Sequence, residues 1–182
     1  MRMAWWLPAV VALATLRVSA QEAYATRSGQ IRFNASTPLE DIEAENTRVN
    51  AILKPESGAF GVVLLIAEFE FPRKLMQEHF NENYLESHKY PKATFAGTLQ
   101  GTAPYLNGES CDCAVSGTLT LHGVARPLTA GVRISRDTSG YRLRSAFTVR
   151  PEAHDIKVPK LLFSKIAEEV QVEIDFWLVP GD

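Results

Sequence analysis

The sequence contains little cysteine and almost no imbalance of charge. Only two of its 182 residues are cysteine, which excludes the small exported proteins that are built on dense disulfides. The 19 basic and 21 acidic side chains give a net charge of −2, so nothing draws the chain to nucleic acid or to an anionic membrane surface. No internal repeat or low-complexity segment is present, and 46% hydrophobic residues is typical of one globular domain.

Motifs for covalent, nucleotide or metal chemistry are also missing. The chain has no GxSxG elbow and no phosphate-binding glycine loop. A zinc site needs three or four converging ligands, and the histidines lack the spacing for one. They are His79, His88, His122 and His154. Acids cluster around Glu40–Glu45, but such clusters usually form a solvated face rather than an acid–base pair. We therefore expect no catalytic residue, no metal and no cofactor, and a lipid hydrolase is the least supported function class.

Residues 1–20 have the pattern of a secretory signal peptide. Arg2 supplies the positive charge, Met3–Leu16 forms an apolar stretch, and Val18-Ser19-Ala20 supplies a cleavage site. The alternative is a membrane anchor, but a spanning helix needs about 20 apolar residues and this run is shorter. No later stretch reaches that length. We expect residues 21–182 to form one exported domain, periplasmic or secreted, with no transmembrane segment.

The rest of the chain is dominated by alternation of apolar and polar residues, which predicts strands. A short helix is expected around Leu75 and Phe80, between the third and fourth strands. Joined mostly by short turns, such strands predict an all-β fold of eight antiparallel strands closed into a barrel, with a two-sheet sandwich as the alternative. The candidate strands are Thr26–Ser36, Ile42–Leu53, Phe60–Phe71, Ala93–Gln100, Cys111–His122, Leu128–Arg136, Tyr141–Arg150 and Val170–Val179. The run Phe60–Phe71 is apolar on both faces and suggests a strand that is covered on both sides.

The two cysteines lie two residues apart, at Cys111 and Cys113. Residues at this spacing in a strand point to the same side, so both sulfurs are expected beside Val115. Three states stay open: two buried thiols, a strained disulfide, and a metal or redox pair. The third is the alternative function for this chain.

The apolar residues are compatible with two kinds of barrel interior. A small eight-stranded barrel either fills its interior with side chains or holds one ligand. Composition by itself favours the packed interior. A helix inserted between strands could plug one mouth of the barrel.

Two blocks of the sequence resemble the YceI-like family of exported, lipocalin-like proteins. The first is FEFPRKLMQEHFNENYLESHKYPKATFAG, from Phe69 to Gly97, and the second is VSGTLTLHGV with the following Arg126-Pro127. The opening SGQIRF also matches the family's first strand. The segment 37–44 and the Cys-x-Cys pair depart from the family pattern.

The resemblance implies a lipocalin-like barrel with a helix near one end. It implies an elongated cavity for an isoprenoid or other long-chain lipid, a carrier or storage role without enzymatic activity, and a homodimer as one oligomeric state. An apolar tail gains about 0.8 kcal/mol per buried methylene, so an apolar tube suffices for binding. The residues expected to line the cavity are Phe33, Leu64, Ile66, Leu75, Met76, Phe80, Phe95, Leu119, Phe147 and Phe176. The inward face of each strand is an assumption here, because a slip of one residue reverses it.

Overall fold

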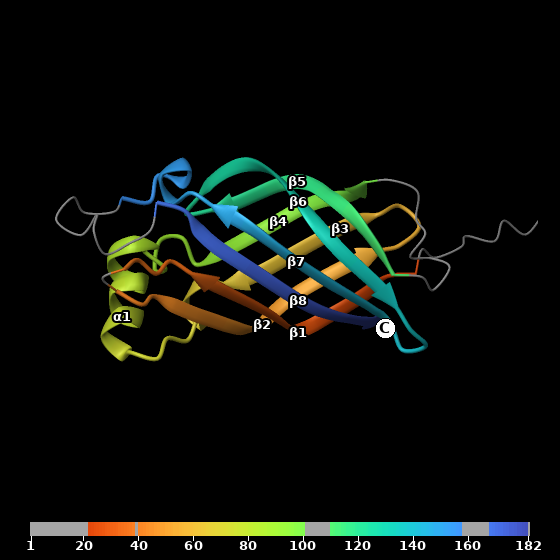
Figure 1. The fold of residues 1–182 in the computed structure, drawn as a ribbon, viewed down its shortest axis with the longest axis horizontal. Helices are drawn as coiled ribbons and strands as arrows, with labels where there is room; N and C mark the ends of the chain where they lie inside the picture. Colours follow the sequence, from red (N-terminus) through yellow and green to blue (C-terminus); the bar gives the residue numbers. More distant parts are fainter. Residues whose placement is uncertain (1–21, 39, 101–109, 158–167, 182) are drawn as a thin grey trace, which may run out of the picture.

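Eight consecutive antiparallel strands close into a barrel in the computed structural model (Figure 1). The structure describes residues 22–38, 40–100, 110–157 and 168–181. The strands are β1 Tyr24–Asn34, β2 Glu43–Lys54, β3 Ala59–Leu65, β4 Lys92–Gln100, β5 Cys111–Leu121, β6 Val124–Arg136, β7 Tyr141–Val149 and β8 Val170–Pro180. β8 pairs with β1, which closes the barrel. The predicted barrel is confirmed, and the sandwich alternative is excluded.

Alternation along the strands sorts side chains to the inside and the outside of the barrel. In β8, Phe176 and Leu178 are fully buried, whereas Trp177 and Val179 between and beyond them are about two-fifths exposed. In β7, Tyr141 and Leu143 are buried in the same way. Because neighbouring residues of a strand point to opposite faces, one face of every strand builds the core.

The third strand is shorter than its apolar run predicts. β3 ends at Leu65, and Ile66–Glu68 forms a 3₁₀ turn, η1. The prediction that Phe60–Phe71 is one strand covered on both faces is therefore wrong. Val63 and Leu65 are each 40% exposed, so only the inner face of β3 is covered.

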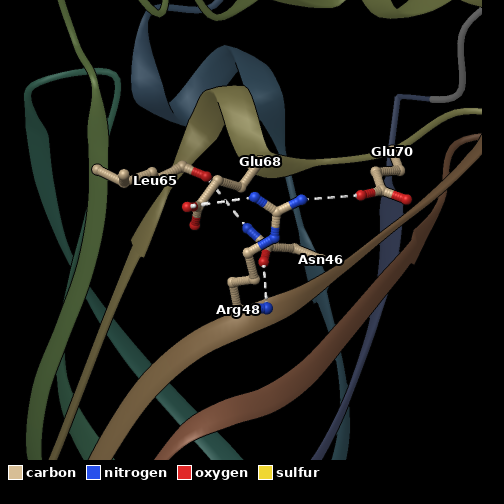
Figure 2. A network of polar contacts seen from close by, with 5 residues as sticks. All are labelled: Asn46, Arg48, Leu65, Glu68 and Glu70. Carbon is tan, nitrogen blue, oxygen red and sulfur yellow. Dashed lines mark hydrogen bonds and ion pairs between the residues drawn. The ribbon is translucent and has the colours of Figure 1, made fainter.

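A buried asparagine accounts for the end of β3 (Figure 2). Asn46 of β2 is fully buried, and its side-chain amide donates to the Leu65 carbonyl oxygen at 3.1 Å. The Asn46 side-chain oxygen accepts from the backbone N–H of Arg48 at 2.9 Å. Arg48 in turn lies 3.1 Å from a Glu70 carboxylate oxygen and 4.0 Å from one of Glu68. The end of the strand is thus held by a side chain from a different strand.

Replacing Asn46 with alanine is expected to lower the free energy of unfolding by about 1–3 kcal/mol, because it leaves buried hydrogen-bonding groups without partners. Urea unfolding measures the loss. Asn50→Ala is the matched control, since Asn50 lies exposed on the same strand and should change stability by less than about 0.5 kcal/mol. Equal effects of the two substitutions would contradict this role of Asn46.

The predicted helical insertion lies between β3 and β4. It consists of α1, Lys74–His79, followed by the π-helical turn η2, Phe80–Tyr84. Figure 1 shows this insertion at one end of the barrel, where the 3₁₀ turn η4, Pro151–His154, also lies. Elements from distant parts of the sequence therefore meet at this end.

Some predictions lie outside the described residues. They are the signal peptide 1–20 and its cleavage site. Among the described helices, none has the length and apolar character that crossing a membrane requires.

Candidate functional site

The barrel encloses a narrow apolar cavity of about 80 Å³. Its lining comes from every strand except β2, and all of the lining side chains are apolar except Thr94 and Ser145. The lining residues are Ile31, Phe60, Val62, Leu64, Ala93, Thr94, Phe95, Leu99, Val115, Leu119, Leu128, Ala130, Val132, Leu143, Ser145, Phe147, Ile174 and Phe176. Such a surface can hold hydrocarbon but offers almost no partner to a polar group.

The structure brings half of the predicted lining residues to this cavity. Those that line it are Leu64, Phe95, Leu119, Phe147 and Phe176. Ile66 is buried in η1, away from the lining, and Met76 is only half-buried on α1. Leu75 is 62% exposed, so the expectation that it faces the interior is wrong. A helix of six residues has too few turns for its sequence spacing to identify the face that packs on the barrel.

Four phenylalanines close the barrel at the end that carries α1. Phe33 of β1 stacks on Phe80 of η2, with ring centroids 5.5 Å apart. Phe69 and Phe71, from the segment after β3, contact both rings at centroid distances between 5.0 and 5.8 Å. Phe33 and Phe80, both predicted to line the cavity, therefore belong to this phenylalanine plug instead.

The opposite end of the barrel is closed by two tyrosines and their neighbours. Tyr24 and Tyr141 meet edge to face, with ring centroids 4.7 Å apart. Leu53 and Leu178 are fully buried beside them in the core. The cavity lies between these closed ends.

A charged hollow of about 550 Å³ lies on the outer wall, over β5, β6, β7, β8 and β1. Arg133 donates to both carboxylate oxygens of Asp112 at 2.7 Å. Asp175 accepts from Arg142 at 2.6 and 2.8 Å and lies 3.4 Å from Arg144. These hydrogen bonds and charges hold the pKa of both carboxyl groups below its ordinary value, with the bond from Arg133 the main cause for Asp112 and that from Arg142 for Asp175.

The Asp175 pairs should contribute to stability only while this carboxyl group is ionised. Because folding lowers its pKa, the contribution is present above the ordinary value of 3.8 and is lost as the pH falls through the folded-state value. Asp175→Asn is expected to cost no more than about 1 kcal/mol at pH 7, since the side chain is about one-third exposed. Urea unfolding from pH 7 to about pH 3 should show the difference shrinking. A difference that is constant with pH would contradict this assignment.

The two cysteines are free thiols, both half-buried and packed against the core. Burial, with the neighbouring Cys111 thiol as the next cause, raises the pKa of Cys113 to about 11. Cys113 is therefore protonated at neutral pH and is a poor nucleophile or metal ligand. Among the described residues, no three His, Cys, Asp or Glu side chains gather as a metal site would require. Nothing here favours the metal or redox alternative.

The acidic cluster is engaged in surface contacts. Glu40 pairs with Arg73 at 2.6 Å, and Glu45 pairs with Arg32 at 3.3 Å. Glu43 accepts a hydrogen bond from Asn34. These carboxylates are partly or fully exposed and are paired with neighbouring polar or basic side chains.

The predicted lining omits thirteen of the eighteen cavity residues, among them Leu128 and Ala130, and the sequence analysis did not find the arginines of the hollow. The alternation predicted this strand from Leu128 onward. The prediction therefore left out the first four residues of β6, Val124–Pro127. Pro127 is a sequence signal of an incompletely paired strand, because proline in a sheet is largely confined to edge strands and bulges.

Solved structures with the same fold come from several bacteria. BcnA of Burkholderia cenocepacia is 17% identical with a TM-score of 0.70, covering 84% of this chain and 96% of its own. A polyisoprenoid binding domain from Saccharophagus degradans, implicated in plant cell wall breakdown, is 14% identical with a TM-score of 0.74, covering 88% and 99%. The YCEI protein of Campylobacter jejuni is 12% identical with a TM-score of 0.57, covering 100% and 99%.

Comparison with the sequences of curated proteins finds no significant match. The family model of the YceI-like domain, in contrast, matches residues 15–178, which is most of the chain. The resemblance in the sequence and the closed eight-stranded barrel agree with that match. The chain belongs to the YceI-like domain family.

Proposed function

We propose that this protein binds the long apolar tail of an isoprenoid or other single-chain amphiphile inside its barrel. The observation that carries the proposal is the cavity, whose lining is apolar at every position except Thr94 and Ser145. Burial of each methylene group contributes about 0.8 kcal/mol, so a tail of ordinary length binds without specific polar contacts. The polyisoprenoid binding domain from Saccharophagus degradans, which shares the fold, supports this ligand class.

The size of the cavity restricts the shape of the ligand. Its volume of about 80 Å³ is well below the roughly 300–1,000 Å³ of most small-molecule pockets. A fused-ring lipid would need a much larger space, whereas a linear chain needs only a narrow tube. The aromatic rings of Phe95, Phe147 and Phe176 line this cavity, and their displacement would enlarge it. The proposed ligand is therefore linear, and its binding displaces aromatic rings of the cavity.

The cellular role that fits such a ligand is storage or transport through an aqueous compartment. The signal-peptide pattern of residues 1–20 supports a location of the mature protein in the periplasm or outside the cell. A long apolar chain is poorly soluble there, and a closed barrel shields it from water. This role requires binding and release, and no catalytic residue.

The test is native mass spectrometry of the protein purified from its own export route, combined with lipid extraction. The expected result is a bound species whose fragments contain an isoprenoid or acyl chain, with the protein beginning at or near Gln21. The same spectrum reports whether the protein is the homodimer that the family resemblance implies. A bare mass, together with no binding of an added prenol by the delipidated protein, would contradict the proposal.

A further inference from the structure

The wall of the barrel is incomplete between β6 and β7. Their pairing covers only Val132–Arg136 of β6 and Tyr141–Ser145 of β7. Beyond it, within the described residues, β6 pairs only with β5 and β7 only with β8. Figure 1 shows the two ribbons close together near their hairpin and farther apart toward the end that carries α1. We call the stretch between Pro127–Gly131 and the last residues of β7, where these two strands form no ladder, the side opening.

Both ends of this side opening are fastened by hydrogen bonds. At one end the Ser145 hydroxyl donates to the Gly131 carbonyl oxygen at 2.5 Å. At the other end η4 holds β6, because Arg126 donates to the Ala153 carbonyl oxygen at 2.7 Å and a His154 ring nitrogen lies 3.1 Å from the Val124 carbonyl oxygen. Arg126 and Gly131 are five steps apart along the strand, or about 17 Å at about 3.4 Å per residue. The gap is thus bounded on all sides rather than being a frayed edge.

The ladder between β2 and β3 is also short, but other residues fill the gap beyond it. Pairing there covers only Asn50–Lys54 of β2. Beyond it, Glu45 forms a bridge with Glu70, and the Asn46 side chain binds the end of β3 (Figure 2). The contrast shows that this fold can close a gap in the wall with backbone and side chains. The described residues do not fill the β6–β7 gap in this way.

Apolar residues of the cavity are accessible at the side opening. Leu128 and Phe147, which lie on its two sides, line the cavity and are only partly buried. The opposite wall, with Phe60, Leu64 and Leu99, is buried. Pro127 pairs with Thr118 of β5 but has no partner in β7, and a strand tolerates a residue without an N–H donor where one of its sides is unpaired. Partly exposed cavity residues thus lie on both sides of the side opening, while the phenylalanine plug and the tyrosine pair lie at the two ends of the barrel.

The charged hollow lies outside this opening and shares part of its lining with the cavity. Val132, Ser145 and Ile174 line both spaces. Three arginines and three carboxylates line the hollow, so their formal charges cancel. They are Arg32, Arg133, Arg144, Asp112, Glu173 and Asp175. A head group with a net negative charge would gain little there, whereas a neutral or zwitterionic one finds both donors and acceptors.

We propose that an amphiphile enters the barrel sideways between β6 and β7, and leaves a neutral or zwitterionic head group in the charged hollow. This inference rests on the proposed function and adds its route and its head-group chemistry. The tail passes the side opening first and displaces the aromatic rings of the cavity. The fastenings at Gly131 and at η4 let the strands part between them without unzipping the hairpin.

A reversible covalent bridge across the opening tests the route. Thr129→Cys and Thr148→Cys are combined, because these two exposed positions lie on β6 and β7 within the side opening, beyond the fastening at Gly131. Cys111→Ser and Cys113→Ser remove the natural thiols. The probe is a farnesol analogue with a neutral nitrobenzoxadiazole head group, followed by stopped-flow fluorescence. We expect association and dissociation of the probe to slow at least tenfold in the oxidised form relative to the reduced form of the same variant.

The matched control carries Ala96→Cys and Thr118→Cys, a pair on the complete β4–β5 ladder, in the same serine background. Its oxidation should not change the rates. Mass spectrometry verifies each bridge, and where no disulfide forms, a short bis-methanethiosulfonate reagent makes it. Equal rates in the bridged and open β6–β7 variant would overturn the side route while leaving the proposed function intact. Failure of the natural-sequence protein to bind the probe would overturn the proposed function itself.

The head-group chemistry is tested with the natural-sequence protein and two further ligands that compete with the probe. Geranylgeraniol is neutral, and geranylgeranyl phosphate carries the same tail with an anionic head group. We expect the alcohol to compete at least as well as the phosphate, with little dependence on salt. Tighter binding of the phosphate that weakens with salt would overturn the assignment of a neutral or zwitterionic head group.

Discussion

Replacing Gly117 with alanine is expected to destabilise the barrel by about 3 kcal/mol, at the upper end for an overpacked core. A Cβ atom at this position would lie 2.3 Å from the Ala96 carbonyl oxygen and 2.5 Å from Gly97 Cα. Both contacts are with backbone, so β4 and β5 must move apart to admit the methyl group. Thermal unfolding should show a midpoint roughly 6–12 °C lower.

The reason for this sensitivity is the Phe95 ring. Gly97 and Gly117 are directly opposite each other in the β4–β5 ladder, and the edge of the ring lies 2.7–2.8 Å from where either Cβ would be. The glycine pair therefore makes the space in which an aromatic residue of the cavity lies against the wall. A Cβ here would also push the ring into the cavity.

Gly131→Ala is the matched control for stability. A Cβ at Gly131 meets no atom within 4 Å, so the same change should shift the free energy of unfolding by less than about 0.5 kcal/mol. If Gly117→Ala is tolerated as well as Gly131→Ala, the close approach of β4 and β5 does not constrain the fold.

Replacing Ala130 with leucine is expected to weaken lipid binding at least tenfold, or by about 1.4 kcal/mol. Ala130 is buried in β6 and lines the cavity, so the larger side chain occupies space that the tail needs. The free energy of unfolding should change by no more than about 1.5 kcal/mol, because the added carbons enter a cavity rather than a packed core. Equilibrium titration with the fluorescent farnesol analogue measures the affinity.

Ala125→Leu is the control for this experiment. It makes the same change on the same strand at an exposed position, and Ala125 is not part of the cavity lining. Its affinity for the probe should match that of the natural sequence. Unchanged binding by Ala130→Leu, with the protein still folded, would show that the tail does not occupy this cavity.

These two substitutions separate the stability of the wall from the capacity of the interior. Gly117 acts through the spacing of two strands, whereas Ala130 acts through the volume that those strands enclose. The fold tolerates little change in the spacing of the two strands. The volume that the strands enclose is small. A cavity of about 80 Å³ implies that side chains must move before a long tail is accommodated.

The local alternation of the sequence determined the strands and their inner faces. Period-two patterns such as that of Val170–Val179 put apolar side chains on one face, and each half-buried strand must turn that face to a common core. Eight such strands in a chain of this length leave closure as the solution that removes exposed edges. The family blocks and the helical insertion were readable for the same reason, since they depend on contiguous residues.

Contacts between residues far apart in the sequence decided where β3 ends and which phenylalanines lie outside the cavity. β3 ends where Asn46 reaches it from β2, and no feature of the run Phe60–Phe71 reveals that partner. The phenylalanine plug joins rings from β1, from the segment after β3 and from η2, so Phe33 and Phe80 could not be told apart from cavity residues by alternation.

The side opening is likewise a property of the tertiary structure. Alternation sets the direction of each side chain but not how many residues of a hairpin remain paired, because barrel closure and the twist of neighbouring strands set that number. The sequence by itself therefore determined an apolar-lined barrel of a known family. Only the folded arrangement decided where its ends are closed and where its wall is open.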